Sequence, residues 1–152
     1  MPRERINLMN PYDMMQDIQK LLTEAKLKPW KSFSEPPHVS IKRQSTSCAI
    51  IPGGFQSESP QESTGGRIGT FSFKVRLYVN QKSDIEGDAA LKALLDTSLE
   101  TLLDALCGYQ GADPYFQGVV YLTSMSDPGK SFTDQEDFLR FLDCNFQVRL
   151  GV

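Results

Sequence analysis

The feature that most constrains the fold is a long alternation of apolar and polar residues in "RIGTFSFKVRLYVNQ", residues 67–81. Because successive side chains of a β-strand point to opposite faces, this alternation predicts a strand with one buried face. The residues expected on the buried face are Phe71, Phe73, Val75, Leu77 and Val79. The residues expected on the other face, against water or a partner, are Thr70, Ser72, Lys74, Arg76 and Tyr78. A strand of this kind is typical of antiparallel sheets.

The same period of two recurs at the C-terminus, in "FLRFLDCNFQVRLGV", residues 138–152. It predicts a strand that runs almost to the last residue, with an apolar face made by Leu142, Cys144, Phe146, Val148 and Leu150. Residues 134–141 favour a loop before this strand, although a helical turn also fits them. Another strand is predicted in "YFQGVVYLTSM", residues 115–125, and two short strands, "HVSIKRQ" and "SCAIIP", between residues 39 and 52.

Two helices are predicted from apolar residues that recur every three or four positions. The first covers residues 11–27, with Asn10 as N-cap, Pro11 in the first turn and Lys28-Pro29 at the end. The second covers residues 85–107 and stops at Gly108.

The order of these elements predicts an α+β fold, with a mainly antiparallel or mixed sheet and both helices packed on one face. Residues 1–152 are expected to form a single domain, since no linker divides the chain. Residues 53–66, "GGFQSESPQESTGG", are rich in Gly, Ser, Pro, Gln and Glu. We expect them to form a flexible loop, either functional or simply disordered.

Composition excludes several classes of protein. With 39% hydrophobic and 23% charged residues, the chain fits a globular protein, and its net charge of −3 lacks the basic excess of a dedicated nucleic-acid binder. The sequence contains neither a run of about 20 apolar residues nor a secretory signal, so no membrane partner is expected.

Three cysteines, Cys48, Cys107 and Cys144, make an odd number without close pairing. We expect reduced, buried and inert thiols in a cytoplasmic compartment.

The sequence gives little support for catalysis. Gly129-Lys130-Ser131 resembles the end of a phosphate-binding loop, but Ser124 stands where that motif needs a glycine, and Pro128 favours a tight turn. His38 is the single histidine. The carboxylates Asp84, Glu86 and Asp88 fit a helix N-terminus better than a calcium loop. We therefore expect no catalytic residues, no metal and no cofactor.

A binding or assembly module remains, and aromatic or basic residues in connectors and on the polar strand face are its candidate contacts. The interaction residues predicted for it are Trp30, Phe33, Phe55, Arg67, Lys74 and Arg76. Tyr109, Tyr115 and Phe116 are further aromatic residues in connectors. The ordinary alternatives are that the aromatic residues cover the core and that the basic residues form a solvated strand face.

The chain resembles the tail terminator (tail completion) proteins of long-tailed bacteriophages. The resemblance covers roughly residues 10–152 and lies in the order and spacing of segments, since no signature motif carries it. The matching segments are "PYDMMQDIQKLLTEAKL", "VSIKRQSTSCAIIPGG", "GTFSFKVRLYVNQ", "DAALKALLDTSLETLLDAL" and "FLDCNFQVRLGV".

The resemblance implies a non-enzymatic, hexameric ring at the head-tail junction of the virion, assembled in the host cytoplasm. Such a ring caps the tail tube protein, ends its polymerisation and presents a surface to a head-completion or neck protein. Genomic DNA passes through it without sequence recognition. The family provides no functional residue that transfers to a numbered position.

Two alternatives remain open. The first is another head-tail connector or neck-completion protein, or a tail tube subunit. The second is a small nucleotide-binding enzyme that uses Lys130 and Ser131.

Overall fold

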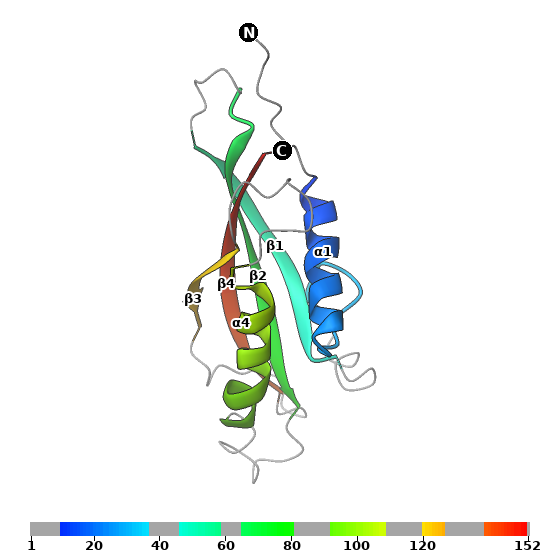
Figure 1. The fold of residues 1–152 in the computed structure, drawn as a ribbon. Helices are drawn as coiled ribbons and strands as arrows, with labels where there is room; N and C mark the ends of the chain where they lie inside the picture. Colours follow the sequence, from blue (N-terminus) through cyan, green and yellow to red (C-terminus); the bar gives the residue numbers. More distant parts are fainter. Residues whose placement is uncertain are drawn as a thin grey trace.

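A computed structural model describes residues 10–36, 46–58, 65–80, 92–108, 120–126 and 139–151. Its centre is a four-stranded sheet with the spatial order β1-β2-β4-β3. The strands are β1 (Cys48–Ser57), β2 (Ile68–Asn80), β3 (Tyr121–Met125) and β4 (Leu139–Gly151). All three pairings are antiparallel. The long strands β2 and β4 form the middle of the sheet (Figure 1), which leaves β1 and β3 as its edges.

Helix α1 (Pro11–Glu24) begins as predicted, because the side chain of Asn10 accepts a hydrogen bond of 2.8 Å from the Tyr12 N–H. Its predicted end at residue 27 is wrong. Lys26 adopts a left-handed backbone with φ 67°, and Leu27 N–H donates back to the Leu22 carbonyl. This C-capping geometry ends the helix before Pro29 is reached.

The second helical segment runs from Lys92 to Leu106 within the described residues. It contains a π-helical stretch, η2 (Leu94–Leu99), followed by α4 (Glu100–Leu106). The helix was predicted, but the wider π turns within it were not. Gly108 follows with φ 83°, which confirms it as the stop. Neither this helix nor α1 is long and apolar enough to cross a membrane, and the same holds across the described residues.

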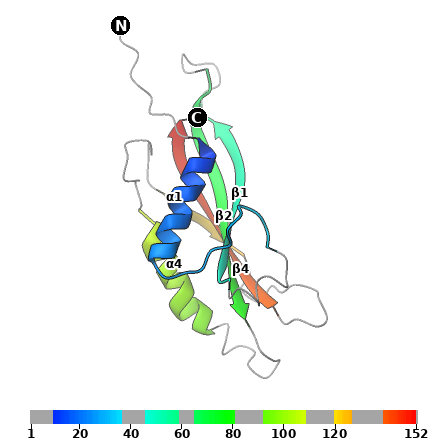
Figure 2. The ribbon, with the colours of Figure 1, turned by 90° about the vertical axis from the view of Figure 1, so that its right-hand side faces the viewer.

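Both helices cover the same face of the sheet, as Figure 2 shows. Their buried side chains, including Met14, Ile18 and Leu102, join one hydrophobic cluster with the apolar faces of β1, β2 and β4. At its centre the rings of Phe73 and Phe146 stack with centroids 5.5 Å apart, as cross-strand partners. The predicted α+β fold, with a mainly antiparallel sheet and two helices on one face, is confirmed.

The predicted loop at residues 53–66 starts too early. Residues 53–57 belong to β1, because Phe55, Gln56 and Ser57 pair with Phe71, Thr70 and Gly69 after a bulge between Pro52 and Phe55. Pairing with a long neighbouring strand outweighs the low strand propensity of two glycines. Gly65 and Gly66 form a turn before β2, and residues 59–64 lie outside the described part of the chain.

The other predicted strands agree with the structure in part. "SCAIIP" is confirmed as part of β1, whereas "HVSIKRQ" lies outside the described residues. The predicted strand at residues 115–125 is described from Tyr121 to Met125. The last strand is confirmed, and it begins at Leu139. The helical turn considered before it falls largely outside the described residues.

Candidate interaction surfaces

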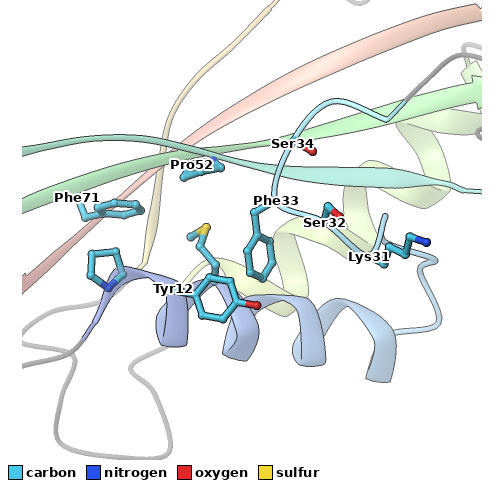
Figure 3. Close-up of a pocket in the computed structure, with 9 residues that line it drawn as sticks. Tyr12, Lys31, Ser32, Phe33, Ser34, Pro52 and Phe71 are labelled. Atoms are coloured by element: carbon cyan, nitrogen blue, oxygen red, sulfur yellow. The ribbon is translucent and has the colours of Figure 1, made fainter.

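The first candidate surface is an apolar groove at the start of α1, which we call the α1 groove (Figure 3). Its volume is about 540 Å³, and its lining residues are Pro11, Tyr12, Met15, Lys31, Ser32, Phe33, Ser34, Pro52 and Phe71. Tyr12 and Met15 come from α1, Phe33 from the segment after it, and the floor from β1 and β2. The Tyr12 side chain is 57% exposed and packs edge to face on Phe33, with centroids 5.3 Å apart.

Hydrogen bonds fix the segment that forms one wall of the α1 groove. The Gln19 side-chain amide donates to the carbonyl oxygens of Trp30 and Lys31, at 3.1 and 3.4 Å. The Trp30 N–H donates to Cys48 O at 2.8 Å, on the outer edge of β1. The groove is therefore held open by a segment tied both to α1 and to the sheet. It offers apolar contact area with two serine hydroxyls and one ammonium group, and it can bind an apolar or aromatic side chain.

The second candidate surface is the sheet face opposite the helices. At one end of it, Arg76 donates to both carboxylate oxygens of Asp143, with Nε–Oδ1 at 2.7 Å and Nη2–Oδ2 at 3.1 Å. Its Nη1 donates to Glu35 at 3.0 Å, and its guanidinium lies 4.2 Å from the centre of the Phe141 ring. Arg76 and Asp143 are buried, beside a cluster made by Trp30, Ala49, Tyr78 and Phe141. At this end of the face, a buried polar network therefore lies beside a small hydrophobic cluster.

Burial and neighbouring charges shift the pKa values of Arg76 and Tyr78 in this network. Burial alone lowers the pKa of Arg76, but the hydrogen bonds and charge of Asp143, with the charge of Glu35, outweigh it and raise the pKa. Burial also raises the pKa of Tyr78. Arg76 and Tyr78 therefore each keep one protonation state through the physiological range, and neither acts as a titrating acid or base.

The other end of the same sheet face is accessible. A shallow depression of about 450 Å³ crosses it, with Lys74, Thr123, Asn145 and Gln147 among its lining residues. Lys74 Nζ lies 3.7 Å from Asp143 Oδ2. Tyr121 donates to the Gln147 side chain at 2.9 Å and is 44% exposed. This end offers amide, hydroxyl and apolar contacts, which suits a protein partner.

The structure distributes the six predicted interaction residues over separate places. Phe33 lines the α1 groove, and Lys74 lines the depression on the sheet face. Trp30 and Arg76 are buried, while Phe55 is half-buried and packs on the core. Arg67 is exposed directly before β2. These residues do not form one site, and their role in interaction stays a prediction.

Sequence reasoning missed the partners that bury Arg76. Asp143 and Glu35 lie 67 and 41 residues away from it in the chain. The available signal was that Arg76 and Asp143 both fall on polar positions of predicted strands. Without the strand pairing, that pattern does not tell which residues are neighbours. Tyr12, the most exposed aromatic residue of the α1 groove, was also missed.

The cysteines differ from one another. Cys48 and Cys144 are fully buried, and burial raises the pKa of each thiol from 9.0 to about 12. Cys107, predicted to be buried, is exposed, because it follows the last turn of α4 at the helix end. No cluster of three metal-binding side chains occurs within the described residues.

Several other candidates lie outside the described residues: His38, Asp84, Glu86, Asp88, Tyr109, Tyr115, Phe116, Pro128, Gly129, Lys130 and Ser131.

Comparisons with known proteins return little. No protein-family model matches the chain, and no curated protein matches it. Among solved structures, a chain from the "Virion of native gene transfer agent (GTA) particle" aligns over 93% of this chain and 91% of that chain. The two are 14% identical, and the TM-score is 0.44. A similarity of this size carries no argument about fold or function, and we infer neither from it.

Proposed function

We propose that this protein is a non-enzymatic virion assembly protein that forms a ring, caps the tail tube of a long-tailed bacteriophage and ends its polymerisation. The observation that supports this proposal is the element order α1, β1, β2, α4, β3, β4. It follows the order of the segments that resemble tail terminators: an early helix, a strand, a long alternating strand, one further helix and a terminal strand.

The proposed mechanism is multivalent docking. A ring presents identical surfaces with the rotational symmetry of the tube end, so weak contacts of each subunit add up to stable capping. The partners are further copies of the chain, a tail tube protein on one side and a head-completion or neck protein on the other. Genomic DNA passes through the ring, and the protein resides at the head-tail junction after assembly in the host cytoplasm.

The α1 groove and the accessible end of the sheet face are the surfaces that fit such partners. Both are lined mostly by apolar and uncharged polar groups, with one lysine each, which is close to the composition expected at the centre of a protein interface. The tail tube subunit and the connector proteins are the alternatives within the same class. A tail tube subunit would also form rings, but its rings would stack into tubes. A connector protein would form a ring that binds on the other side of the junction.

The first test is the native mass of the purified protein by light scattering after gel filtration, with negative-stain images of the same peak. A closed ring of a few copies, or a monomer that becomes a ring when tail tubes are added, supports the proposal. Stacked tubes formed by the protein alone point to a tube subunit. A monomer that ignores tail tubes contradicts the proposal.

The nucleotide-binding alternative has its own test. If the unmodified protein binds neither ATP nor GTP in a fluorescence or calorimetric titration, that alternative is removed. If it binds one of them, loss of binding in Lys130→Ala assigns the site.

A further inference from the structure

A second groove follows the C-terminal half of α1 and the segment after it, and we call it the lysine groove. Its volume is about 490 Å³, and its lining includes the lysines Lys20, Lys28 and Lys31 and the apolar side chains of Leu27 and Pro29. All three lysines are exposed. Among the described residues none of them forms an ion pair with a carboxylate. The lining of the groove therefore carries three positive charges and no carboxylate.

The outer face of the second helical segment carries the opposite charge. Asp96, Glu100 and Asp104 are spaced by four residues and are all exposed. Residues at this spacing lie on the same side of a helix. These three carboxylates also form no ion pair with a described residue. Like charges in a row repel one another, and a row of ammonium groups on a partner would relieve that repulsion.

The two surfaces are attached to opposite edges of the sheet. The segment that forms the lysine groove is tied to the β1 edge, because Pro29 bridges to Cys48 and Trp30 N–H donates to Cys48 O. The end of α4 is tied to the β3 side, because Gly108 N–H donates to Val120 O at 2.9 Å, just before β3 begins. Figure 1 shows α1 on the β1 side of the molecule and α4 nearer the β3 side.

We infer that the lysine groove binds the acidic outer face of the η2–α4 helix of a second copy of this chain. This inference deepens the proposed ring function and rests on it. A contact between two different surfaces on opposite edges is heterologous, and it produces a ring when the rotation between copies closes. Charge complementarity provides the orientation, while Leu27 and Pro29 supply apolar contact at the base of the groove.

The test uses two charge-reversal variants of the full chain. The first carries Lys20→Glu and Lys28→Glu, and the second carries Glu100→Lys and Asp104→Lys. In either variant alone, the lysine groove of one copy and the η2–α4 face of the next carry charges of the same sign. We therefore expect self-association to weaken at least about tenfold. Sedimentation velocity at low salt measures it. In an equal mixture, each contact between one copy of each variant brings opposite charges together, so the mixture is expected to recover assembly.

The control is Asp13→Lys, which reverses an exposed carboxylate in the first turn of α1, outside both charged surfaces, and is expected to assemble like the unmodified protein. Thermal unfolding followed by circular dichroism checks that all variants fold. Unchanged assembly of both variants overturns the inference, and so does a mixture that fails to recover. Absence of self-association in the unmodified protein at low salt also overturns it. Rings that assemble as expected but ignore tail tubes contradict the capping function and leave this interface intact.

Discussion

At the scale of single residues, Lys26 carries a conformational cost at the end of α1. Its φ of 67° lies in the left-handed region, where a side chain with a Cβ is disfavoured and glycine is not. Lys26 is exposed and lies outside the hydrophobic core. We therefore expect Lys26→Gly to stabilise the protein by about 0.5–1 kcal/mol, measured by urea unfolding. Lys26→Ala, which keeps the Cβ, is the control and should leave the stability unchanged.

Two neighbouring glycines of β1 are expected to respond differently to the same substitution. A Cβ on Gly53 would lie 2.6 Å from the backbone oxygen of Ser72, whereas a Cβ on Gly54 would meet nothing within 4 Å. Gly53→Ala should destabilise the protein by about 1–3 kcal/mol through this overlap. Gly54→Ala should be neutral or slightly stabilising. Equal effects in urea unfolding would contradict the strand assignment of residues 53–57.

The three thiols should react at different rates with a thiol reagent at pH 8. Cys107 is exposed and should react first, while Cys48 and Cys144 are buried with pKa values raised to about 12. We expect one fast equivalent in the native protein and three after denaturation. Cys107→Ser should remove the fast phase, and a fast phase that survives this substitution would show that a buried thiol is accessible.

The same pKa values predict a loss of stability at alkaline pH. In the unfolded chain the thiols ionise near pH 9.0, but in the folded protein they stay protonated up to about pH 12. The unfolded state thus binds fewer protons between these values, so the free energy of unfolding falls as the pH rises from 9 towards 12. The limit is about 1.4 kcal/mol per pH unit for each thiol. Urea unfolding at pH 8 and pH 10 measures the slope, which should decrease in Cys144→Ala.

At the scale of secondary-structure elements, the buried Arg76–Asp143 pair joins β2 to β4, and Glu35 connects the segment after α1 to it. Removing one partner of a buried ion pair leaves a charge without compensation. Asp143→Ala should therefore cost about 3–5 kcal/mol in the free energy of unfolding. Glu35 is 59% exposed, and Glu35→Ala should cost less than about 1 kcal/mol. If the two variants unfold at the same urea concentration, the pair contributes no more than a surface contact.

The elements that were predictable are those whose local signals agree with their packing. Asn10 caps α1, and the alternating residues of β4 from Leu142 to Leu150 are buried as the pattern requires. The end of α1 and the extent of β1 were not predictable. Lysine does not favour the left-handed backbone that Lys26 adopts, so its sequence position gave no sign of a helix end. Gly53 joins a strand only because β2 lies beside it.

The candidate surfaces were less predictable than the fold. Alternation along β2 shows which side is apolar, but it does not show what covers the polar side. Arg76 was expected on a face against water or a partner and is instead buried with Asp143, with its guanidinium over the ring of Phe141. Phe33 and Lys74, by contrast, do line hollows on the surface. The difference depends on contacts between residues far apart in the chain, which a sequence pattern does not encode.

At the scale of the whole molecule, the sheet divides the structure into a helix-covered face and a second face that is only partly covered by described residues. The segment of the lysine groove is tied to the β1 edge, the end of α4 is tied to the β3 side, and the α1 groove lies between α1 and the strands. A ring built from edge-to-edge contacts would leave the α1 groove and the sheet face for the tail tube and the neck protein.

The ring also predicts a dependence on ionic strength. Contacts between exposed lysines and carboxylates are screened by salt, with a Debye length of about 10 Å at 0.1 M and about 3 Å at 1 M. Self-association of the unmodified protein should weaken as salt is raised, as measured by sedimentation velocity. Association that strengthens with salt would indicate a mainly apolar contact instead.

The measurement that tests the central claim most directly is tube growth in the presence of this protein. A purified tail tube protein is polymerised with and without the purified chain, and tube lengths and ends are recorded by negative-stain electron microscopy. The capping function predicts extra ring-shaped density at one end of each tube and a halt in lengthening. Tubes that continue to grow with bare ends would contradict it.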